Sequence, residues 1–409
     1  MNKANERQTD ILSIIESLDI SPTMYKNAEE KYHTLASFLE NCGIEADIYP
    51  QGSFALGTVV RPVAKDPDAA YDLDFICQLR KTKDEIAPSE LRIIIEEALE
   101  SSERYSGKLK IFEECFTIEY ADIDGVSFTI DIVPAADETA VRKQELREKS
   151  RRPDLIDTAV AIPRHNGDRN YSWITNNPRG FRSWFEEINR PFLEYDQANR
   201  RMRLFKANRQ IFASVDDIPD GIDRSAMQRV VQLLKYHRDV YFMKLQREDR
   251  DELKPISVIV NTLVAEISKS ANPNGSVFEL LHYVLHELSI YAYRQKLKNN
   301  EFNREFGERS VITKSEENGE WIIQNPADPD DNLADKWNEN PMISQYFFQW
   351  IGTCTKDLVE ALSLPDQQFR STMENAFGAA TIKKNWANKY NQMRVEPKPI
   401  VTSPKPFHE

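Results

Sequence analysis

Tyr71–Leu79 reads YDLDFICQL, and this stretch decides the class of fold that the chain can adopt. An apolar run directly follows two acids, Asp72 and Asp74, as expected for a strand inside the protein. Residues i and i+2 of a strand point to the same face and lie about 7 Å apart. Two carboxylates so placed repel each other, and a divalent cation with oxygen ligands is the simplest compensation. The stretch therefore predicts a strand with a metal site on one face.

A third acid, Asp131, lies between two isoleucines in the middle of FTIDIVPA (128–135). A carboxylate in a buried strand needs a partner, and a strand beside the first would bring it to the two earlier acids. Three carboxylates can hold two Mg²⁺ ions about 4 Å apart, one activating a hydroxyl and the other supporting a leaving pyrophosphate. Asp72, Asp74 and Asp131 are therefore the candidate catalytic and metal-binding residues of a nucleotidyl transfer.

The Asp-x-Asp spacing alone is weak evidence, because it also arises by chance. Asp122-Ile123-Asp124 has the same spacing but runs into Gly125, and Asp124-Gly125 is a strong signal for a hairpin turn. We therefore expect this second pair to shape the turn between strands at Lys110–Tyr120 and Val126–Pro134.

A glycine-containing loop, QGSFALGT (51–58), precedes the first acidic strand. Gly52 allows the backbone to approach a ligand closely, and Ser53 can cap a helix or donate to a phosphate oxygen. A lone Gly-Ser pair is more often a helix cap. Its position before two acidic strands makes Gln51, Gly52 and Ser53 candidate nucleotide-binding residues.

The order of expected elements indicates a mixed sheet followed by helices, and 409 residues favour two lobes. We expect a catalytic lobe at 1–199 with N-terminal helices, a helical lobe at 200–394, and a proline-rich, extended or disordered tail at 395–409. The expected elements of the first lobe are a helix capped by Ser21 up to about Asn41, strands at Ala46–Tyr49 and Tyr71–Leu79, and a helix capped by Ser89. Those of the second lobe are helices at Ser225–Lys244, Ile256–Lys269 and Val277–Lys298, interrupted later at Pro326–Pro329.

The composition excludes several classes of protein. No apolar run approaches the ~20 residues of a membrane span, and the N-terminus lacks a secretory signal, so we expect a cytoplasmic protein without a membrane association. The four cysteines form no CxxC pair, which disfavours a zinc site. His282 and His286 stand four apart on an expected helix, but no acid of the HExxH type adjoins them, so a metal pair there is the weaker alternative.

A formal net charge of −13 disfavours binding to long nucleic acid. Two basic runs do occur, at Arg142–Arg152 with six Lys or Arg and at Arg200–Arg209 with five. They are either solvated helix faces or a positive lining for small polyphosphates, which the net charge allows.

The ordered set QGSFALGT, YDLDF and FTIDIVPA resembles the DNA polymerase β nucleotidyltransferase superfamily. NPADPDDNLADKW (325–337) is similar to the proline-acid segment of oligoadenylate synthases, and Ser225–Asp239, ending QLLKYHRD, resembles their triphosphate-reaching helix. With WITNNPRGFRSWF (173–185), the chain resembles bacterial CD-NTases over roughly residues 25–390. These relatives of cyclic GMP–AMP synthase make cyclic oligonucleotides for antiphage signalling. The resemblance implies an α+β fold with a mixed-sheet catalytic lobe and a helical, oligoadenylate-synthase-like second lobe.

The same resemblance implies roles for single residues. Gly52 and Ser53 would contact the donor's β- and γ-phosphates, while the three aspartates bind two Mg²⁺ ions, with Mn²⁺ as a substitute. His237 is expected to pack, not to catalyse. The further nucleotide-binding candidates are Lys235 and Ser257 at the triphosphate, and Tyr71, Asn176 and Arg179 at the base or ribose, where an Asn-Pro turn is an equal alternative.

The implied partners are ATP, GTP or other nucleoside triphosphates and a separate effector protein that reads the product. No zinc-bearing insertion is present, so no duplex DNA activator is expected. The chain ends in Lys405–Glu409 and not in the Gly or Ala through which several CD-NTases are ligated, although a regulatory protein could still bind the tail.

Three hypotheses about function remain open at this point. The favoured one is synthesis of a cyclic di- or trinucleotide from purine nucleotides, in CBASS-type antiphage defence. The second is a template-independent RNA-tailing or RNA-modifying transferase, and the third is an inactive nucleotide- or partner-binding module. The joined bases, the 2′–5′ or 3′–5′ linkage and the ring size are not fixed by sequence.

Overall fold

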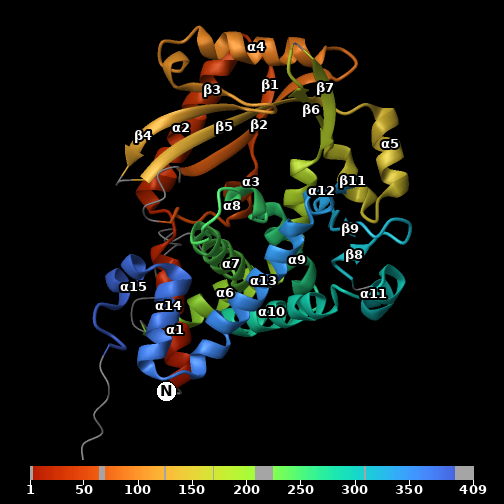
Figure 1. Ribbon diagram of the computed structural model, residues 1–409. Coiled ribbons are helices and arrows are strands. Elements are labelled where there is room, and N and C mark those ends of the chain that lie inside the picture. Colours follow the sequence, from red (N-terminus) through yellow and green to blue (C-terminus); the bar gives the residue numbers. More distant parts are fainter. Residues whose placement is uncertain are drawn as a thin grey trace, which may run out of the picture.

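The computed structural model describes residues 3–63, 70–123, 126–168, 170–207, 224–307 and 310–391. Figure 1 shows a sheet with its flanking helices in the upper part of the molecule and a helical bundle in the lower part. The tail expected at 395–409, the turn residues Asp124 and Gly125, and the end of the basic run at Arg200–Arg209 lie outside the described residues.

The sheet has seven strands among the described residues, with β1, β2, β5, β4 and β3 in this order and β6 and β7 continuing from β5. β2 and β5 are parallel, while β1–β2, β4–β5, β3–β4, β5–β6 and β6–β7 are antiparallel. A mixed sheet is therefore confirmed. The bounds are β1 Ala46–Pro50, β2 Ala70–Thr82, β3 Leu109–Ile111, β4 Phe116–Ile123, β5 Val126–Asp137, β6 Val160–His165 and β7 Tyr171–Asn176.

Helices α2 (Pro22–Asn41) and α4 (Pro88–Glu100) pack on one face of this sheet around a shared apolar core. Ser21 caps α2 as expected, since its side chain accepts a hydrogen bond from the Met24 N–H and Pro22 takes the first helical position. Ser89 does not cap α4, because the helix already begins at Pro88 after Ala87. Proline at the first helical position decides this helix start.

Two other expectations need correction. The stretch Lys110–Tyr120 is not one strand: β3 ends at Ile111 and β4 begins at Phe116, with a turn closed by the Phe112 N–H and the Cys115 carbonyl. The stretch 51–58 is not a plain loop, since it holds the short helix α3 (Gly52–Leu56), which Gly57 ends in the left-handed conformation.

The lower part is built from helices that share one large apolar core. Ser225 caps α7 through a capping box with Gln228, and Ser276 caps α10 in the same way with Glu279. The bounds of the helices after the sheet are α6 Pro178–Ala207, α7 Ala226–Met243, α8 Arg250–Leu253, α9 Ser257–Ser268, α10 Val277–Arg294, α11 Asn299–Phe306, α12 Asp335–Glu339, α13 Pro341–Leu358, α14 Asp366–Phe377 and α15 Ala379–Trp386.

Helix α1 (Lys3–Ser17) belongs to this helical core and not to the sheet, and so does α6. Ile11, Ile14 and Ile15 of α1 are fully buried there, and the buried guanidinium of Arg7 forms an ion pair with Asp366. The expected boundary at residue 199 therefore does not separate the two cores. The first helix crosses to the second lobe, and α6 passes from the sheet into the bundle (Figure 1).

The proline-acid segment forms a small antiparallel pair, β10 (Gln324–Asn325) and β11 (Asp328–Asn332), beside another pair, β8 (Thr313–Lys314) and β9 (Trp321–Ile322). Asp330 of β11 accepts from both Arg142 and Lys149 of helix α5 (Ala140–Lys149). Much of the first basic run is thereby paired with acids. Within the described part of the chain, no helix combines the length and the apolar character that a membrane crossing needs.

Candidate active site

The three candidate acids lie together because of the register between β2 and β5. Asp74 is the direct partner of Asp131 on these two parallel strands, and Asp72 is the partner of Thr129. Residues opposite each other in a sheet point to the same face, and so do residues two apart on one strand. Asp72, Asp74 and Asp131 therefore share one face of the sheet.

Threonines on the neighbouring strands hold two of the carboxylates. Thr129 donates to Asp72 Oδ1 at 2.5 Å, and Thr117 of β4 donates to Asp131 Oδ1 at 2.6 Å. Each bond orients its carboxylate and leaves the second oxygen for another partner. The two threonines therefore fix the carboxylates of Asp72 and Asp131. Asp74, the third acid, lines the cleft.

Burial raises the pKa of all three acids, and the charge of neighbouring acids adds to this at Asp74 and Asp131. For Asp74 the causes are burial first, then the charges of Asp131 and Asp72, and together they raise its pKa to about 7. Burial of its carboxylate also raises the pKa of Asp72, and the hydrogen bond from Thr129 partly offsets this rise. The residue as a whole is nevertheless exposed to solvent. The pKa of Asp131 is raised by burial against the bond from Thr117. Like charges this close are stable together only if a proton or a cation is shared among them.

The donor set fits a hard divalent cation, which prefers carboxylate oxygens. Within the part of the chain that the structure describes, no three Asp, Glu, His or Cys side chains are already closed around one point as a metal cage. Asp72 and Asp74 line the cleft, whereas Asp131 stands beside Asp74 without lining it. A cation would draw the free oxygens of the outer acids toward Asp74. His282 and His286 both lie exposed on α10 and belong to no such group either.

Gly52 lies against Asp74 at the floor of the cleft. The Gln51 N–H donates to the Asp74 carbonyl at 2.8 Å, and Gly52 has a φ of +63° in the left-handed region. A Cβ on residue 52 would overlap Asp74 Oδ2. Ser53 is the second residue of α3 and accepts no capping bond, so its hydroxyl is not used by the helix start. The strand, the glycine and the acid are thus positioned as one unit.

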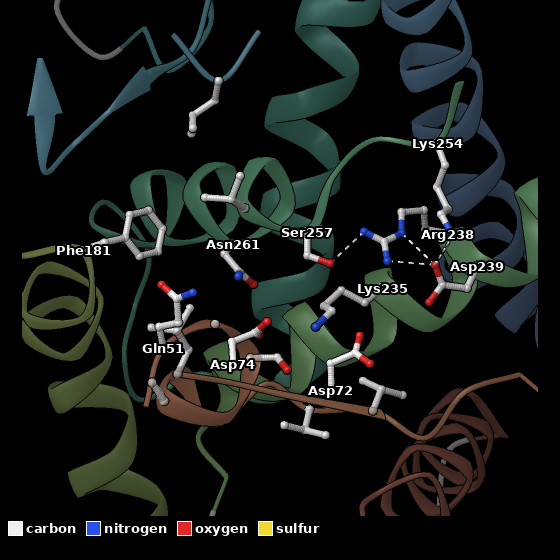
Figure 2. A pocket seen from close by; sticks show the side chains of 18 of the residues that line it. Gln51, Asp72, Asp74, Phe181, Lys235, Arg238, Asp239, Lys254, Ser257 and Asn261 are labelled. Atoms are coloured by element: carbon white, nitrogen blue, oxygen red, sulfur yellow. Dashed lines mark hydrogen bonds and ion pairs between the residues drawn. The ribbon is translucent and has the colours of Figure 1, made fainter. Parts of the chain in front are cut away.

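Lys235 reaches the site from α7 in the helical core. Its side chain is 7% exposed, and its Nζ donates to the Thr58 carbonyl at 3.1 Å, just after α3. Burial and the nearby Arg238 lower the pKa of the Lys235 ammonium to about 8, against the attraction of the acids. Figure 2 shows Lys235 beside Asp72 and Asp74 and directed toward the same space.

Ser257 begins α9 on the opposite wall of the cleft. Its hydroxyl accepts a hydrogen bond from Arg238 Nη1 at 3.1 Å, and Arg238 also forms an ion pair with Asp239 at 2.8 Å (Figure 2). Because Arg238 occupies a lone pair of the hydroxyl, the proton of Ser257 is left to point elsewhere, including into the cleft. Sequence reasoning included Ser257 and missed Arg238, which is only 5% exposed.

The residues expected at the base or ribose separate into three cases. Asn176 lines the cleft at the end of β7. Arg179 does not line it, because its guanidinium covers the ring of Tyr49 at 3.7 Å. The Tyr71 side chain lies outside the described residues. His237 is 1% exposed, and its ring accepts from the Trp350 indole N–H, so it packs as expected.

The cleft between sheet and bundle has a volume of about 650 Å³. Besides the expected residues, it is lined by Phe181 of α6, Asn261 of α9 and Asn325 of β10. Phe181 and Asn325 lie in the stretches 173–185 and 325–337, which were quoted for the resemblance without a role for these two residues, and Asn261 lies in an expected helix. The cleft is large enough for a nucleotide, and both acids and basic groups line it.

The comparisons with known proteins agree with this geometry. A family model described as cyclic GMP-AMP synthase DncV-like, nucleotidyltransferase domain, matches residues 46–134, which include all three acids and Gly52. A c-di-GMP synthase of Roseivirga ehrenbergii is 23% identical over 385 residues, which cover 92% of this chain and 85% of the relative.

Solved structures show the same fold. The CD-NTase CdnG of Bradyrhizobium diazoefficiens in complex with GTP superposes with a TM-score of 0.65 at 19% identity, covering 94% of this chain and 98% of that one. A DncV dinucleotide cyclase of Vibrio cholerae in complex with ATP and GTP gives a TM-score of 0.51 at 16% identity, with coverage of 82% and 71%. The expected two-lobed α+β fold is thereby confirmed, and residues 46–134 match a DncV-like nucleotidyltransferase domain, in agreement with the resemblance to CD-NTases.

Proposed function

We propose that the protein joins nucleoside triphosphates, in the first place purine ones, into a cyclic di- or trinucleotide. In each step a ribose 2′- or 3′-oxygen forms a bond to the α-phosphorus of a second nucleotide. The bond from that phosphorus to the β-phosphate oxygen breaks, and pyrophosphate leaves with the electron pair. The register of Asp74 beside Asp131, with Gly52 against the same carboxylate, is the observation that carries this proposal.

The candidate residues at the cleft have separate tasks in this proposal. The backbone of Gly52 and the hydroxyl of Ser53 hold the donor's phosphates, and the Lys235 ammonium neutralises part of their charge. Asp72, Asp74 and Asp131 would hold two Mg²⁺ ions, or Mn²⁺, which activate the hydroxyl and support the leaving group. Ser257, oriented by Arg238, completes the phosphate end of the cleft.

RNA tailing is the second candidate, and two observations count against it. A long RNA needs a continuous basic path, whereas the chain carries a net charge of −13. In the described part of the first basic run, Arg142, Lys143, Arg147 and Lys149 are all paired with acids. The cleft suits small polyphosphates better than a polymer.

The test is to incubate the purified chain with all four radiolabelled nucleoside triphosphates and Mg²⁺, with and without a short RNA. Products are treated with phosphatase and identified by mass spectrometry, which also gives the bases, linkage and ring size. Phosphatase-resistant small products support the proposal. Labelled RNA supports tailing instead, and tight nucleotide binding without turnover under Mg²⁺ or Mn²⁺ supports an inactive binding module.

We further propose that the product is a cytoplasmic signal, read by a separate effector protein in antiphage defence. The similarity of the chain to a c-di-GMP synthase supports this, since a small cyclic product can diffuse to a receptor. Bacteria that express the chain with its neighbouring genes should resist phage, and the Asp131→Asn variant should remove the resistance. Equal resistance with both would contradict the signalling role.

A further inference from the structure

The cleft has two ends of different chemistry. At one end stand the ammonium groups of Lys235 and Lys254 and the guanidinium of Arg238, with Asp239 neutralising part of their charge. Toward the other end stand the uncharged side chains of Gln51, Phe181 and Asn261, as Figure 2 shows, and the charge of Arg182, which also lines the cleft, is paired with Glu186. A triphosphate would take the cationic end, because its oxygens are anionic. The nucleoside is then left for the uncharged end.

Asn261 has an unused hydrogen-bonding atom at this uncharged end. The residue is only 4% exposed, yet it lines the cleft, and its Oδ1 has no hydrogen-bond partner. Residues four apart on a helix lie on the same face, so Asn261 follows Ser257 along the cleft wall of α9. In Figure 2 its amide points into the space above Asp74 and Gln51. A buried acceptor without a partner is destabilising, and such atoms are rare unless a ligand or water satisfies them.

The chemistry of this atom restricts what can satisfy it. An amide oxygen only accepts hydrogen bonds, so its partner must carry a proton. Ionised phosphate oxygens carry none, whereas a base N–H and a ribose O–H do. We infer that Asn261 positions the nucleoside of the bound triphosphate, with Oδ1 accepting a hydrogen bond from a base N–H or a ribose O–H. This rests on the proposed function only in taking a nucleotide as the ligand of the cleft.

Thr262 provides a matched comparison on the same helix. It is 1% exposed, and its Oγ1 also lacks a partner, but it does not line the cleft. Both residues therefore bury an unsatisfied polar atom, and only one of them faces the ligand. Replacing Thr262 by Val removes such an atom without touching the cleft.

The test measures the affinity of the full chain for non-hydrolysable triphosphates by calorimetry, in the presence of Mg²⁺. The ligands are a parent nucleotide and analogues that lack the 2′-hydroxyl, the 3′-hydroxyl or the exocyclic amine of the base. For the natural chain, removal of the contacted proton weakens binding by roughly 3- to 10-fold, as expected for one hydrogen bond. Asn261→Leu binds the parent nucleotide more weakly by a similar factor and no longer distinguishes that one analogue. The identity of that analogue shows whether Asn261 contacts the base or the ribose.

Two further variants make the result specific. Asn261→Asp keeps the acceptor oxygen, so it restores discrimination between parent and analogue, even though its charge weakens all nucleotides equally. Thr262→Val keeps both affinity and discrimination. Asn261→Leu is close in size and removes a buried orphan, so its thermal stability should match or exceed that of the natural chain.

The inference is overturned if Asn261→Leu binds like the natural chain, or if it loses the same factor with every analogue, which would indicate a structural role only. Failure of the proposed function looks different. A chain that binds nucleotides with this coupling but yields no cyclic product keeps the inference and loses the function. A chain that makes the cyclic product, but in which Asn261→Leu does not alter discrimination between the nucleotide analogues, keeps the proposed function and loses the inference.

Discussion

Gly52 and Asp74 fill the same corner of the cleft, since a Cβ on residue 52 would overlap Asp74 Oδ2. The contact joins the start of α3 to the middle of β2, and the bond from the Gln51 N–H to the Asp74 carbonyl fixes it. A glycine is required here for two reasons, its positive φ and the lack of space. The phosphate-binding backbone and the acid that would hold a metal are therefore set at one fixed distance.

The first prediction follows from this contact. Gly52→Ala should reduce kcat/KM by at least about 100-fold, because Asp74 must turn away from its position and misplacement of a reacting group is costly. It should also lower the free energy of unfolding by about 1–3 kcal/mol through backbone strain. Product formation and thermal denaturation measure the two effects.

Gly43→Ala is the matched control for this change. Gly43 also has a positive φ, +81°, but a Cβ there would meet nothing within 4 Å. It should therefore cost about 1 kcal/mol of stability and leave kcat/KM unchanged. Similar losses of activity in both variants would mean that strain alone, and not the Asp74 contact, makes Gly52 necessary.

A second prediction concerns Asp131, which stands next to Asp74 in the sheet. Asp131→Asn should lower kcat by roughly 100-fold or more, because a metal-bound transition state is worth several kcal/mol. Its Oδ1 can still accept from Thr117, and one repulsive charge is removed, so the thermal stability without metal should be equal or higher. Steady-state kinetics and thermal denaturation in EDTA provide the measurements.

Asp47→Asn is the control on the same sheet, because Asp47 is an exposed acid of β1 paired with Arg80. It should change neither kcat nor stability by a measurable amount, as exposed ion pairs contribute little. Cyclic product from Asp131→Asn at the natural rate would remove the two-metal assignment.

The position of the three acids on one face of the sheet could be predicted because their chemistry is local. An acid within an apolar strand needs a partner whatever the rest of the chain does, and the register then follows from which strands pair. The helix starts at Ser21 and Ser225 could also be predicted from sequence, since a capping residue acts on the first turn of its own helix. By contrast, Ser89 failed as a cap because Pro88 competed for the same helix start.

Properties that depend on contacts between distant segments of the chain could not be predicted from the sequence. The isoleucines of α1 indicate a buried face, but nothing in their spacing says that this face packs in the helical core. Arg179 was a candidate nucleotide ligand through the resemblance, whereas its guanidinium covers the ring of Tyr49. The unpartnered Oδ1 of Asn261 exists only once α9 stands opposite α3.

A third prediction is the effect of pH on the metal-free protein. The pKa of Asp74 is raised from the ordinary 3.8 to about 7, so the folded chain holds a proton that the unfolded chain has lost. The contribution of this group to stability is full below pH 3.8 and is lost as the pH rises through 7. In EDTA, the melting temperature should therefore fall between pH 5 and pH 8 by more in the natural chain than in Asp74→Asn.

Divalent cations should reverse this trend. Mg²⁺ needs the deprotonated carboxylates, so it should stabilise the chain at pH 8 and have little effect at pH 5. Thermal denaturation with and without Mg²⁺ at the two pH values tests this directly. A stabilisation that is as large in Asp74→Asn as in the natural chain would place the cation elsewhere.

The last prediction concerns the alkaline side and depends on Lys235. Burial lowers the pKa of its ammonium to about 8 in the free protein, so the charge that would meet the phosphates is lost as the pH rises through this value. The contribution of this group to folding stability has the opposite sign: it rises between pH 8 and 10.5, because there the unfolded chain binds the extra proton. Affinity for a non-hydrolysable triphosphate in Mg²⁺ should accordingly decline with a midpoint near pH 8.

Lys235→Met should weaken that affinity by roughly 10- to 100-fold at pH 7, as for the loss of a charged hydrogen bond, and should flatten the profile above it. Lys254→Met is the control, since the Lys254 side chain is about a third exposed and its ammonium stands 3.9 Å from Asp239. It should lower affinity by a small factor and keep the midpoint near pH 8. The Lys235 ammonium donates to the Thr58 carbonyl and lies beside the acids. If the decline of affinity near pH 8 persisted in Lys235→Met, another group would be responsible for the pH dependence of triphosphate binding.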